Sequence, residues 1–192
     1  MSRTDAQATF NGALKALRGV KSRPEIIIEE SPAPARLAPY AVALTADVIA
    51  SPNAESELAT GRFVLLYDPA GHEAWEGSFR CVTFVRAELE REMETDPLLP
   101  EIGWTWLIEA LAAHDAAFVA PSGTVTRVAS QSFGQLADRV PTAEIEIRAS
   151  WTPKGTIDAN LAAWFDVLAT CAGLPPVPEG VSMLSGARRG TR

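Results

Sequence analysis

The strictest pattern in the sequence is the alternation of apolar and polar residues in TAEIEIRASW, residues 142–151. One side of a strand built from this segment carries Ile145, Ile147, Ala149 and Trp151. The other side carries Glu144, Glu146, Arg148 and Ser150. A strand with one apolar and one polar face is typical of an antiparallel sheet that is covered on one side only. We therefore expect a sheet with one face against a core and the other in water.

A β-hairpin is predicted between residues 63 and 85. The run FVLLY (63–67) favours a strand, and DPAG (68–71) has the Pro and Gly placement of a tight turn. In the return strand, one face carries Trp75, Gly77, Phe79, Cys81, Thr83 and Val85. The opposite face carries Glu76, Ser78, Arg80, Val82 and Phe84.

The remaining segments complete an α+β pattern. Helical periodicity or preference is found in residues 5–20, 87–96 and 158–173, and in a helix that starts within 96–101 and ends near His114. Further strands are predicted at 25–30, 40–50 and 117–131. The Pro-rich stretch 31–39 reads as a connector. We predict a single antiparallel sheet of about five to six strands packed by helices, in the order α-β-β-β-α-β-β-α. This order is similar to that of secretion-chaperone-like folds, which bind peptides or dimerise.

The ends of two helices are marked by capping residues. Asp96 is the expected cap of the helix that contains Gly103, and Asp158 is the expected N-cap of the last helix. Gly173 would end that last helix. Its predicted core face consists of Leu161, Trp164, Phe165, Leu168 and Cys171.

The segment GWTWLIEALAAHDAAF (103–118) raises the possibility of a functional site. On a helical wheel, Trp104 shares a stripe with Ile108 and Leu111, which predicts that this stripe faces the core. Trp106 falls on the opposite side, where either another element or a partner would cover it. His114 and Asp115 are adjacent and cannot face each other in a regular helix, so we expect no His–Asp dyad between them.

Length and composition fit one soluble domain with extensions at both ends. The chain has 192 residues, of which 47% are hydrophobic and 21% charged. We assign residues 1–23 to an amphipathic N-terminal helix, 24–175 to the α+β domain and 176–192 to a flexible tail. Neither a signal-peptide core nor a membrane-length apolar run is present, which predicts a cytoplasmic protein that does not enter a membrane. Cys81 and Cys171 lie in apolar surroundings and are expected to be buried free thiols.

Charge is distributed unevenly along the chain, whose net charge is −7. Residues 1–23 contain five cationic side chains against Asp5, and residues 186–192 contain three arginines. The body between the two ends is therefore more acidic than the whole. An acidic body repels phosphate backbones, so nucleic acid is an unlikely partner.

Motifs that carry known chemistry are missing from the sequence. It contains no glycine-rich phosphate-binding loop, no nucleophile elbow and no metal-ligand motif. We therefore expect no cofactor and no metal, and can assign no catalytic residue. The sequence leaves enzymatic activity open and favours a non-enzymatic role.

Several phrases together resemble one family. They are GRFVLLYDPAGHEAWEGSFRCVTFVRAELE, DPLLPEIGWTWLIEAL, GTVTRVASQSFG, AEIEIRASWTP and AWFDVLATCAGLPPVPEGV. In these phrases the chain resembles an actinobacterial family known as domain of unknown function 3000. The resemblance covers the chain from about residue 24 onward and implies a cytoplasmic, single-domain protein. It brings no activity, cofactor or catalytic residue.

Two functional hypotheses remain. The first is a protein-binding or regulatory module whose partner is another protein or a second copy of the chain, with Trp106 at the interface. The second is a small-molecule-binding protein or enzyme, with a pocket between sheet and helices. That pocket would be lined by Trp75, Trp104 and Trp151, and Arg80 or Arg148 would anchor an anionic ligand.

Overall fold

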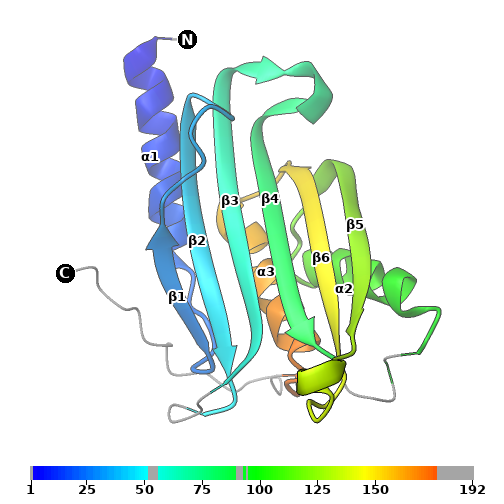
Figure 1. Cartoon of the computed structure of the whole chain (residues 1–192). Helices are drawn as coiled ribbons and strands as arrows, with labels where there is room; N and C mark the ends of the chain where they lie inside the picture. The colour runs from blue at the N-terminus through cyan, green and yellow to red at the C-terminus, as the bar shows by residue number, and fades with distance from the viewer. Residues whose placement is uncertain (1, 52–55, 90–92, 94, 177–192) are drawn as a thin grey trace.

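The computed structural model describes residues 2–51, 56–89, 93 and 95–176. Within these described residues, a six-stranded sheet has three α-helices on one face and none on the other (Figure 1). The helices are α1 (Arg3–Gly19), α2 (Leu99–Ala113) and α3 (Ile157–Cys171). The strands are β1 (Ile26–Ser31), β2 (Tyr40–Ile49), β3 (Glu57–His72), β4 (Gly77–Glu88), β5 (Phe118–Ser130) and β6 (Thr142–Pro153).

The strands lie in the order β1-β2-β3-β4-β6-β5, and every neighbouring pair is antiparallel. The predicted α+β class with one antiparallel sheet is confirmed. A first helix, a run of strands, a helix, two strands and a last helix follow one another as expected. The short run at 25–30 forms a strand of its own, so four strands precede α2.

The main core lies between the sheet and the helices, and the alternation in β6 is confirmed. Ile145, Ile147, Ala149 and Trp151 are all buried on the covered face. The predicted core face of α3 is also confirmed, since Leu161, Trp164, Phe165, Leu168 and Cys171 are buried. Trp164 has no exposed surface and packs against Phe63, with ring centroids 5.7 Å apart.

Helix α1 belongs to the same core. Its apolar stripe buries Ala6, Phe10, Ala13 and Leu17. The Phe10 ring stacks on Tyr67 at 6.2 Å and lies 5.5 Å from Tyr40. A helix whose aromatic side chain is held in this way is an integral part of the domain.

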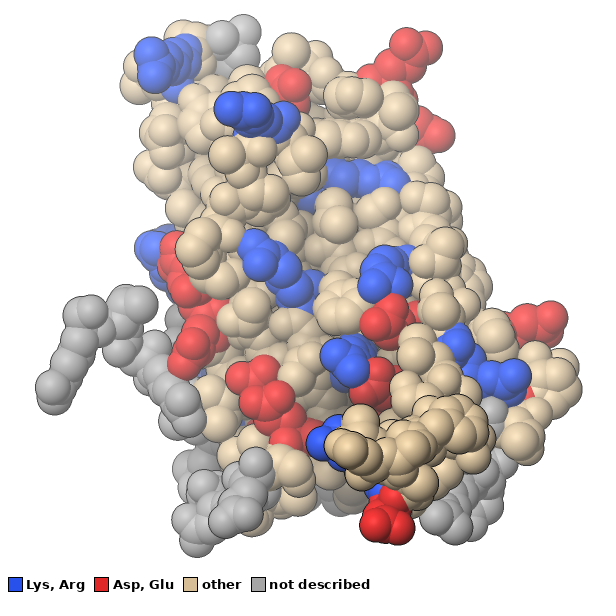
Figure 2. All heavy atoms as spheres, viewed as in Figure 1, with Lys and Arg blue, Asp and Glu red and all other residues tan. Residues whose placement is uncertain are grey.

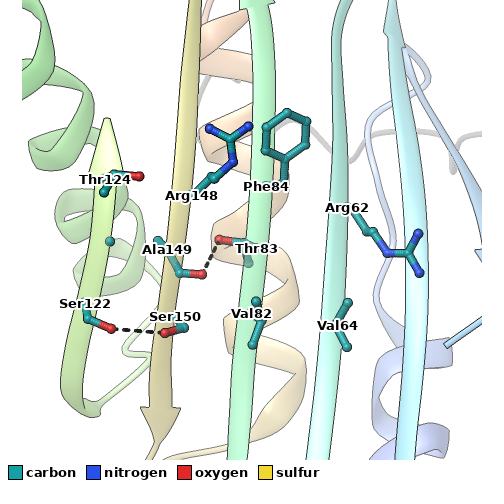
Figure 3. Close-up of a pocket in the computed structure, with 11 residues that line it drawn as sticks. Arg62, Val64, Val82, Thr83, Phe84, Ser122, Thr124, Arg148, Ala149 and Ser150 are labelled. Carbon is teal, nitrogen blue, oxygen red and sulfur yellow. Dashed lines mark hydrogen bonds between the residues drawn. The ribbon is translucent and has the colours of Figure 1, made fainter. Parts of the chain in front are cut away.

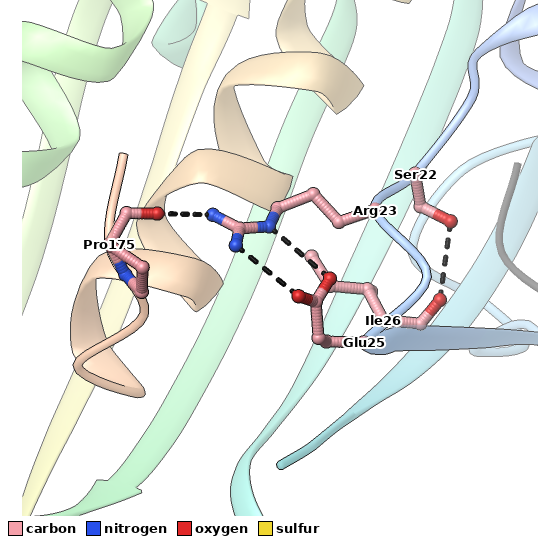
Figure 4. Close-up of polar contacts among 5 residues, drawn as sticks. All are labelled: Ser22, Arg23, Glu25, Ile26 and Pro175. Atoms are coloured by element: carbon pink, nitrogen blue, oxygen red, sulfur yellow. Dashed lines mark hydrogen bonds and ion pairs between the residues drawn. The ribbon is translucent and has the colours of Figure 1, made fainter. Parts of the chain in front are cut away.

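A clasp joins the segment after α1 to the segment after α3 (Figure 4). Arg23 pairs with Glu25 at 3.5 Å and donates a 2.7 Å hydrogen bond to the carbonyl oxygen of Pro175. Backbone hydrogen bonding and the Arg23 guanidinium lower the pKa of the Glu25 carboxyl, against the opposing effect of burial. The clasp therefore brings residues 23 and 175, far apart in sequence, into contact.

The hairpin forms, but the chain does not reverse where the sequence predicted it. DPAG lies inside β3, and the reversal comes later, at the 3-10 turn of Glu73–Trp75. In DPAG, the Asp68 carboxylate accepts a hydrogen bond from the amide of Ala70, and Gly71 has φ +76°. These features produce a bulge between Tyr67 and His72, so the tight-turn signal marked an irregularity in the strand.

The predicted caps need two corrections. The residue before α2 is Leu98, and Asp96 instead accepts a hydrogen bond from the Leu98 amide in the preceding turn. The N-cap of α3 is Thr156, which leaves Asp158 in the first turn. Gly173 has φ +68° just beyond α3, as expected of a helix-ending glycine. The predicted helix at 87–96 begins inside β4 and falls partly on residues outside the described ranges.

Both cysteines are free and buried, as the sequence predicted. Burial raises the pKa of the Cys171 thiol to about 12 and that of Cys81 further still. Neither thiol ionises appreciably at neutral pH, so both behave as small apolar side chains.

Candidate functional site

The uncovered face of the sheet carries a groove of about 690 Å³ (Figure 3). It runs across β3, β4, β6 and β5, which come from three separate parts of the chain. The residues that line it include Arg62, Val64, Val82, Phe84, Arg148 and Ser150. In Figure 3, Val64 and Val82 lie side by side on β3 and β4, and the next row along the strands holds Arg62, Phe84 and Arg148.

Arg80 is buried at one end of this face, with 6% of its surface exposed. Its two terminal nitrogens donate four hydrogen bonds. The acceptors are the Ala120 carbonyl at 2.8 Å and the hydroxyls of Thr152, Ser122 and Ser150 at 3.3, 3.2 and 2.7 Å. Burial lowers the pKa of its guanidinium, yet arginine stays protonated in proteins.

The Arg80 hydrogen bonds also hold an irregular part of β5. Ala120 has φ +48°, a left-handed conformation that side chains other than glycine rarely adopt. A bulge between Val119 and Ser122 interrupts the pairing of β5 with β6 at the same place. By bonding the Ala120 carbonyl and the Ser122 hydroxyl, Arg80 fixes the bulge and places Ser122 at the groove.

Arg148 lies at the other end of the groove. Its guanidinium carbon is 5.1 Å from the centre of the Phe84 ring, and Nη1 is 2.6 Å from a carboxylate oxygen of Glu146. Strands β4 and β6 place Phe84 and Arg148 directly opposite one another. The pairing leaves Arg148 half in water, where its remaining N–H groups can reach a ligand.

Arg62 forms the third cationic part of the face. It donates a 2.6 Å hydrogen bond to the Pro32 carbonyl, in the connector between β1 and β2. Among the residues that the structure describes, neither Arg62 nor Arg80 has a carboxylate within ion-pair distance. Figure 2 shows Lys and Arg side chains across the middle of this face, around a hollow in the surface. The groove thus has a positive rim in a protein of net negative charge.

Trp75 lies on the groove side of the sheet. It packs with Val64, Leu66 and Val82 in a small second cluster and stacks on His72 at 4.9 Å. The sequence had placed it on the same face as Cys81. That prediction was wrong because β4 begins only at Gly77, after Glu76 adopts a left-handed conformation that breaks the alternation.

The orientation of α2 also differs from the expectation. Its buried residues are Leu99, Gly103, Leu107, Ala110 and Leu111. Trp104 and Trp106 flank this stripe on either side, and both are half-buried against the main core. The helix is apolar around most of its circumference, so a helical wheel does not identify which of its faces is buried. Gly103 decides the orientation, because it lets the helix approach the side chains of Ile145 and Val125.

The predicted pocket between sheet and helices is not formed by the three tryptophans. Trp151 is buried in the core and donates a 2.6 Å hydrogen bond to Asn160. Trp104 lies against Gly123, and Trp75 is on the other face of the sheet. Of the predicted site residues, Arg80, Arg148 and Trp75 thus share the open face, whereas Trp106 lies behind the sheet.

His114 does form a pair with an aspartate, but with Asp166 of α3. Its Nε2 is 2.7 Å from the Asp166 carboxylate, while the neighbouring Asp115 has φ +50° just beyond α2. The pair joins two helices at their exposed surface. His114 also lines a second hollow between α1 and α3. Sequence spacing could not reveal a contact between residues 52 positions apart.

Sequence reasoning did not identify Arg62, Ser122 and Ser150 as groove residues. The sequence placed Ser150 on the polar face of β6 together with three other polar residues, and nothing distinguished it from them. Arg62 lies two positions before Val64 and shares its face, a signal that was present but not used. Ser122 follows a bulge, where strand alternation gives no guide.

Other kinds of site find little support within the described ranges. No group of three His, Cys, Asp or Glu side chains in the described part of the chain is placed to hold a metal ion. Among the described helices, none is both long and apolar enough to cross a membrane.

Comparison with known proteins gives one match. Residues 6–182 match the family described as Protein of unknown function (DUF3000). No curated protein and no solved structure matches the chain. Because the family match spans far more than half of the sequence, the chain belongs to the DUF3000 family.

Proposed function

We propose that the protein is a non-enzymatic binding module that holds a partner protein on the open face of its sheet. One observation carries this proposal: Arg62 and Arg148 line an apolar groove on the face that none of the described helices covers, and the buried Arg80 lies at one end of it. Two of these three cations have no carboxylate partner in the described structure. Such a surface favours a partner segment that combines acidic and apolar side chains.

A protein partner suits this surface better than a nucleic acid does. Phosphate backbones need many cationic contacts, and this chain carries a net charge of −7. The cations that are present lie around Val64 and Val82, so apolar contact accompanies the charge. Both a different protein and a second copy of this chain, whose body is itself acidic, fit this description.

The groove hydroxyls favour binding over catalysis. A nucleophilic serine needs a base that takes its proton. Ser122 and Ser150 instead accept hydrogen bonds from the Arg80 guanidinium. Their oxygen lone pairs are engaged in these bonds and are therefore less available to attack a substrate. Their role is more consistent with orienting a ligand.

A second candidate function is the binding of a small anionic molecule. The groove volume, about 690 Å³, falls within the range of about 300–1,000 Å³ that is typical of small-molecule sites. Arg148 would then serve as the anionic anchor, with Phe84 as an apolar wall. This reading retains the Arg anchor but moves the pocket to the open face.

Selection from a random peptide library displayed on bacteria tests the main proposal. We expect the selected peptides to be rich in Asp, Glu and apolar residues, and to bind the purified protein. The double variant Arg62→Glu/Arg148→Glu should lose at least about tenfold in affinity, because two favourable charge contacts become repulsive.

The matched control is Arg3→Glu/Lys21→Glu, which makes the same charge change at exposed positions outside the open face. It should leave peptide affinity unchanged. Selected peptides without acidic enrichment, or equal losses in both double variants, would contradict the proposal. Peptides that fail to bind while small anions do bind would favour the second candidate.

We also propose that the protein acts in the cytoplasm. Two buried thiols that remain free suit a reducing compartment. Cell fractionation with antibodies against the protein checks this, and recovery in a secreted fraction would contradict it.

A further inference from the structure

The end of the groove nearest Arg80 has an unusual arrangement of hydrogen bonds. The Ser122 and Ser150 hydroxyl oxygens both accept from the same Arg80 nitrogen and lie 3.1 Å apart. Figure 3 shows this hydroxyl pair at the edge of the groove, level with Val82 on its floor. Ser122 is exposed and Ser150 half-buried, so the pair is accessible to a ligand.

The two serine hydroxyls have more protons than their mutual contact uses. Each hydroxyl has one proton, and both oxygens are already acceptors for Arg80. One proton is used in the contact between the two serines. The other has no acceptor among the contacts of the pair in the described structure, so it is available to a ligand. The pair thus presents one hydrogen-bond donor toward the groove.

The charge beneath the pair makes this donor selective for anions. Arg80 is bonded only to neutral oxygens, namely one carbonyl and three hydroxyls. A buried cation without a nearby anion creates a positive potential, and a hydroxyl that accepts from a cation becomes a stronger donor. Arg80 itself has no free terminal N–H, so it acts through the serines as a positioning residue.

We infer that this end of the groove binds a carboxylate group that has an apolar group beside it. The carboxylate would accept the hydrogen bond of the Ser122–Ser150 pair, and the apolar group would cover Val82 and Val64 toward Phe84. One donor and one underlying cation suit a monoanion, whereas a phosphate brings more charge and more acceptors than the site can satisfy. The carboxylate can belong to an acidic side chain of a protein or to a small organic acid.

This inference rests on the proposed function in one respect, that the open face is the binding surface. It does not require the partner to be a protein. The experiment is therefore built so that the two can fail separately.

Nuclear magnetic resonance titration with phenylacetate tests the inference. Phenylacetate joins a carboxylate to an aromatic group, and phenylacetamide is its neutral equivalent. We expect phenylacetate to shift the amide signals of residues 82–84, 122–124 and 148–150, with a dissociation constant on the order of millimolar. Phenylacetamide and inorganic phosphate should shift these signals far less. Equal shifts with the acid and the amide, or none with either, would overturn the inference.

The variant Ser122→Ala/Ser150→Ala removes the hydroxyl donor, together with two of the four acceptors of Arg80, and leaves the other lining side chains in place. Its affinity for phenylacetate should fall by about tenfold, because a hydrogen bond to a charged group is lost. The matched control is Thr126→Ala/Ser130→Ala, which changes two exposed residues of β5 outside the groove. The amide spectrum of each variant reports whether the sheet is intact. If a folded serine variant binds as well as the wild type, the inference is wrong.

Peptides distinguish the source of the carboxylate from the site itself. Acidic peptides that bind wild type and lose affinity in the serine variant would support both proposals. Peptides that bind both equally would overturn the inference and leave the proposed function standing. Binding of phenylacetate without binding of any peptide would leave the inference standing and count against a protein partner.

Discussion

The two faces of the sheet are built from the same strands and yet have different chemistry. On the covered face, β4 and β6 contribute Cys81, Val85 and Ile147, each at most 1% exposed. On the open face, the same strands contribute the partly buried Phe84 and the exposed Arg148. Strand alternation alone therefore divides each strand between a structural and a binding role. Stability should depend on the covered face, and ligand affinity on the open face.

The largest difference should appear when an aromatic residue is removed from each face. Trp164→Ala leaves a cavity under the sheet and should lower the free energy of unfolding by about 3–5 kcal/mol. Phe84→Ala removes a half-buried ring and its contact with Arg148, and should cost about 1 kcal/mol. Urea denaturation of both variants measures the two losses of unfolding free energy. Equal losses would contradict the assignment of stability to the covered face.

A smaller effect is expected at Gly123, where the two faces meet at the edge of the sheet. A Cβ there would lie 2.7 Å from the Trp104 ring on the covered side and would also clash with the Arg148 carbonyl oxygen. Gly123→Ala should therefore cost about 2–3 kcal/mol and disturb the groove.

The control for this variant is Gly12→Ala in α1, where the new methyl group meets no neighbour within 4 Å. It should gain about 0.5–1 kcal/mol, because alanine favours a helix interior. Thermal unfolding measures both. A stable Gly123→Ala protein would show that β5 can move away from α2.

Within the open face, Arg80 and Arg148 should differ as well. Arg80→Met removes four hydrogen bonds and the support of the Ala120 conformation, and should cost about 1–2 kcal/mol. Arg148→Met loses an exposed ion pair and should cost less than about 1 kcal/mol. The same denaturation measurement ranks them, and the reverse order would show that Arg80 is not structural.

The smallest effect is expected at the rim of the covered face, in the clasp of Arg23, Glu25 and Pro175. The folded state lowers the pKa of Glu25, so its contribution to stability is present above the unfolded pKa of about 4.3. That contribution is lost as pH falls through the lowered folded-state pKa. Glu25→Gln should therefore cost up to about 1 kcal/mol at pH 7 and little at pH 2. If Glu25→Gln still lowers the free energy of unfolding at pH 2, the effect comes from packing and not from the charge of Glu25.

The covered face was largely predictable from sequence, whereas the open face was not. Strict alternation in β6 identified the buried residues, because burial imposes a period of two on the chain. Periodicity failed for α2, whose apolar residues surround the helix and whose orientation depends on contact at Gly103. The groove depends on β6 lying between β4 and β5, a strand order that local patterns do not encode.

The arginines illustrate this difference most clearly. Arg80 and Arg148 were recognised as candidates because they stand on polar strand faces. Their relation to Ser122 and Arg62 follows only from the tertiary arrangement. It brings the Arg80 guanidinium to 3.2 Å from the hydroxyl of Ser122, 42 positions away in the sequence. The contact of His114 with Asp166 was hidden for the same reason.

The most direct test of the open face as a binding surface is photo-crosslinking in cells. A photoreactive amino acid at Thr124, on the groove rim, should form a covalent adduct with a protein, and one at Thr9, on α1, should not. Adding Arg62→Glu and Arg148→Glu to the Thr124 variant should abolish the adduct. An adduct that survives both substitutions, or one that forms from Thr9 alone, would contradict the assignment of binding to this face.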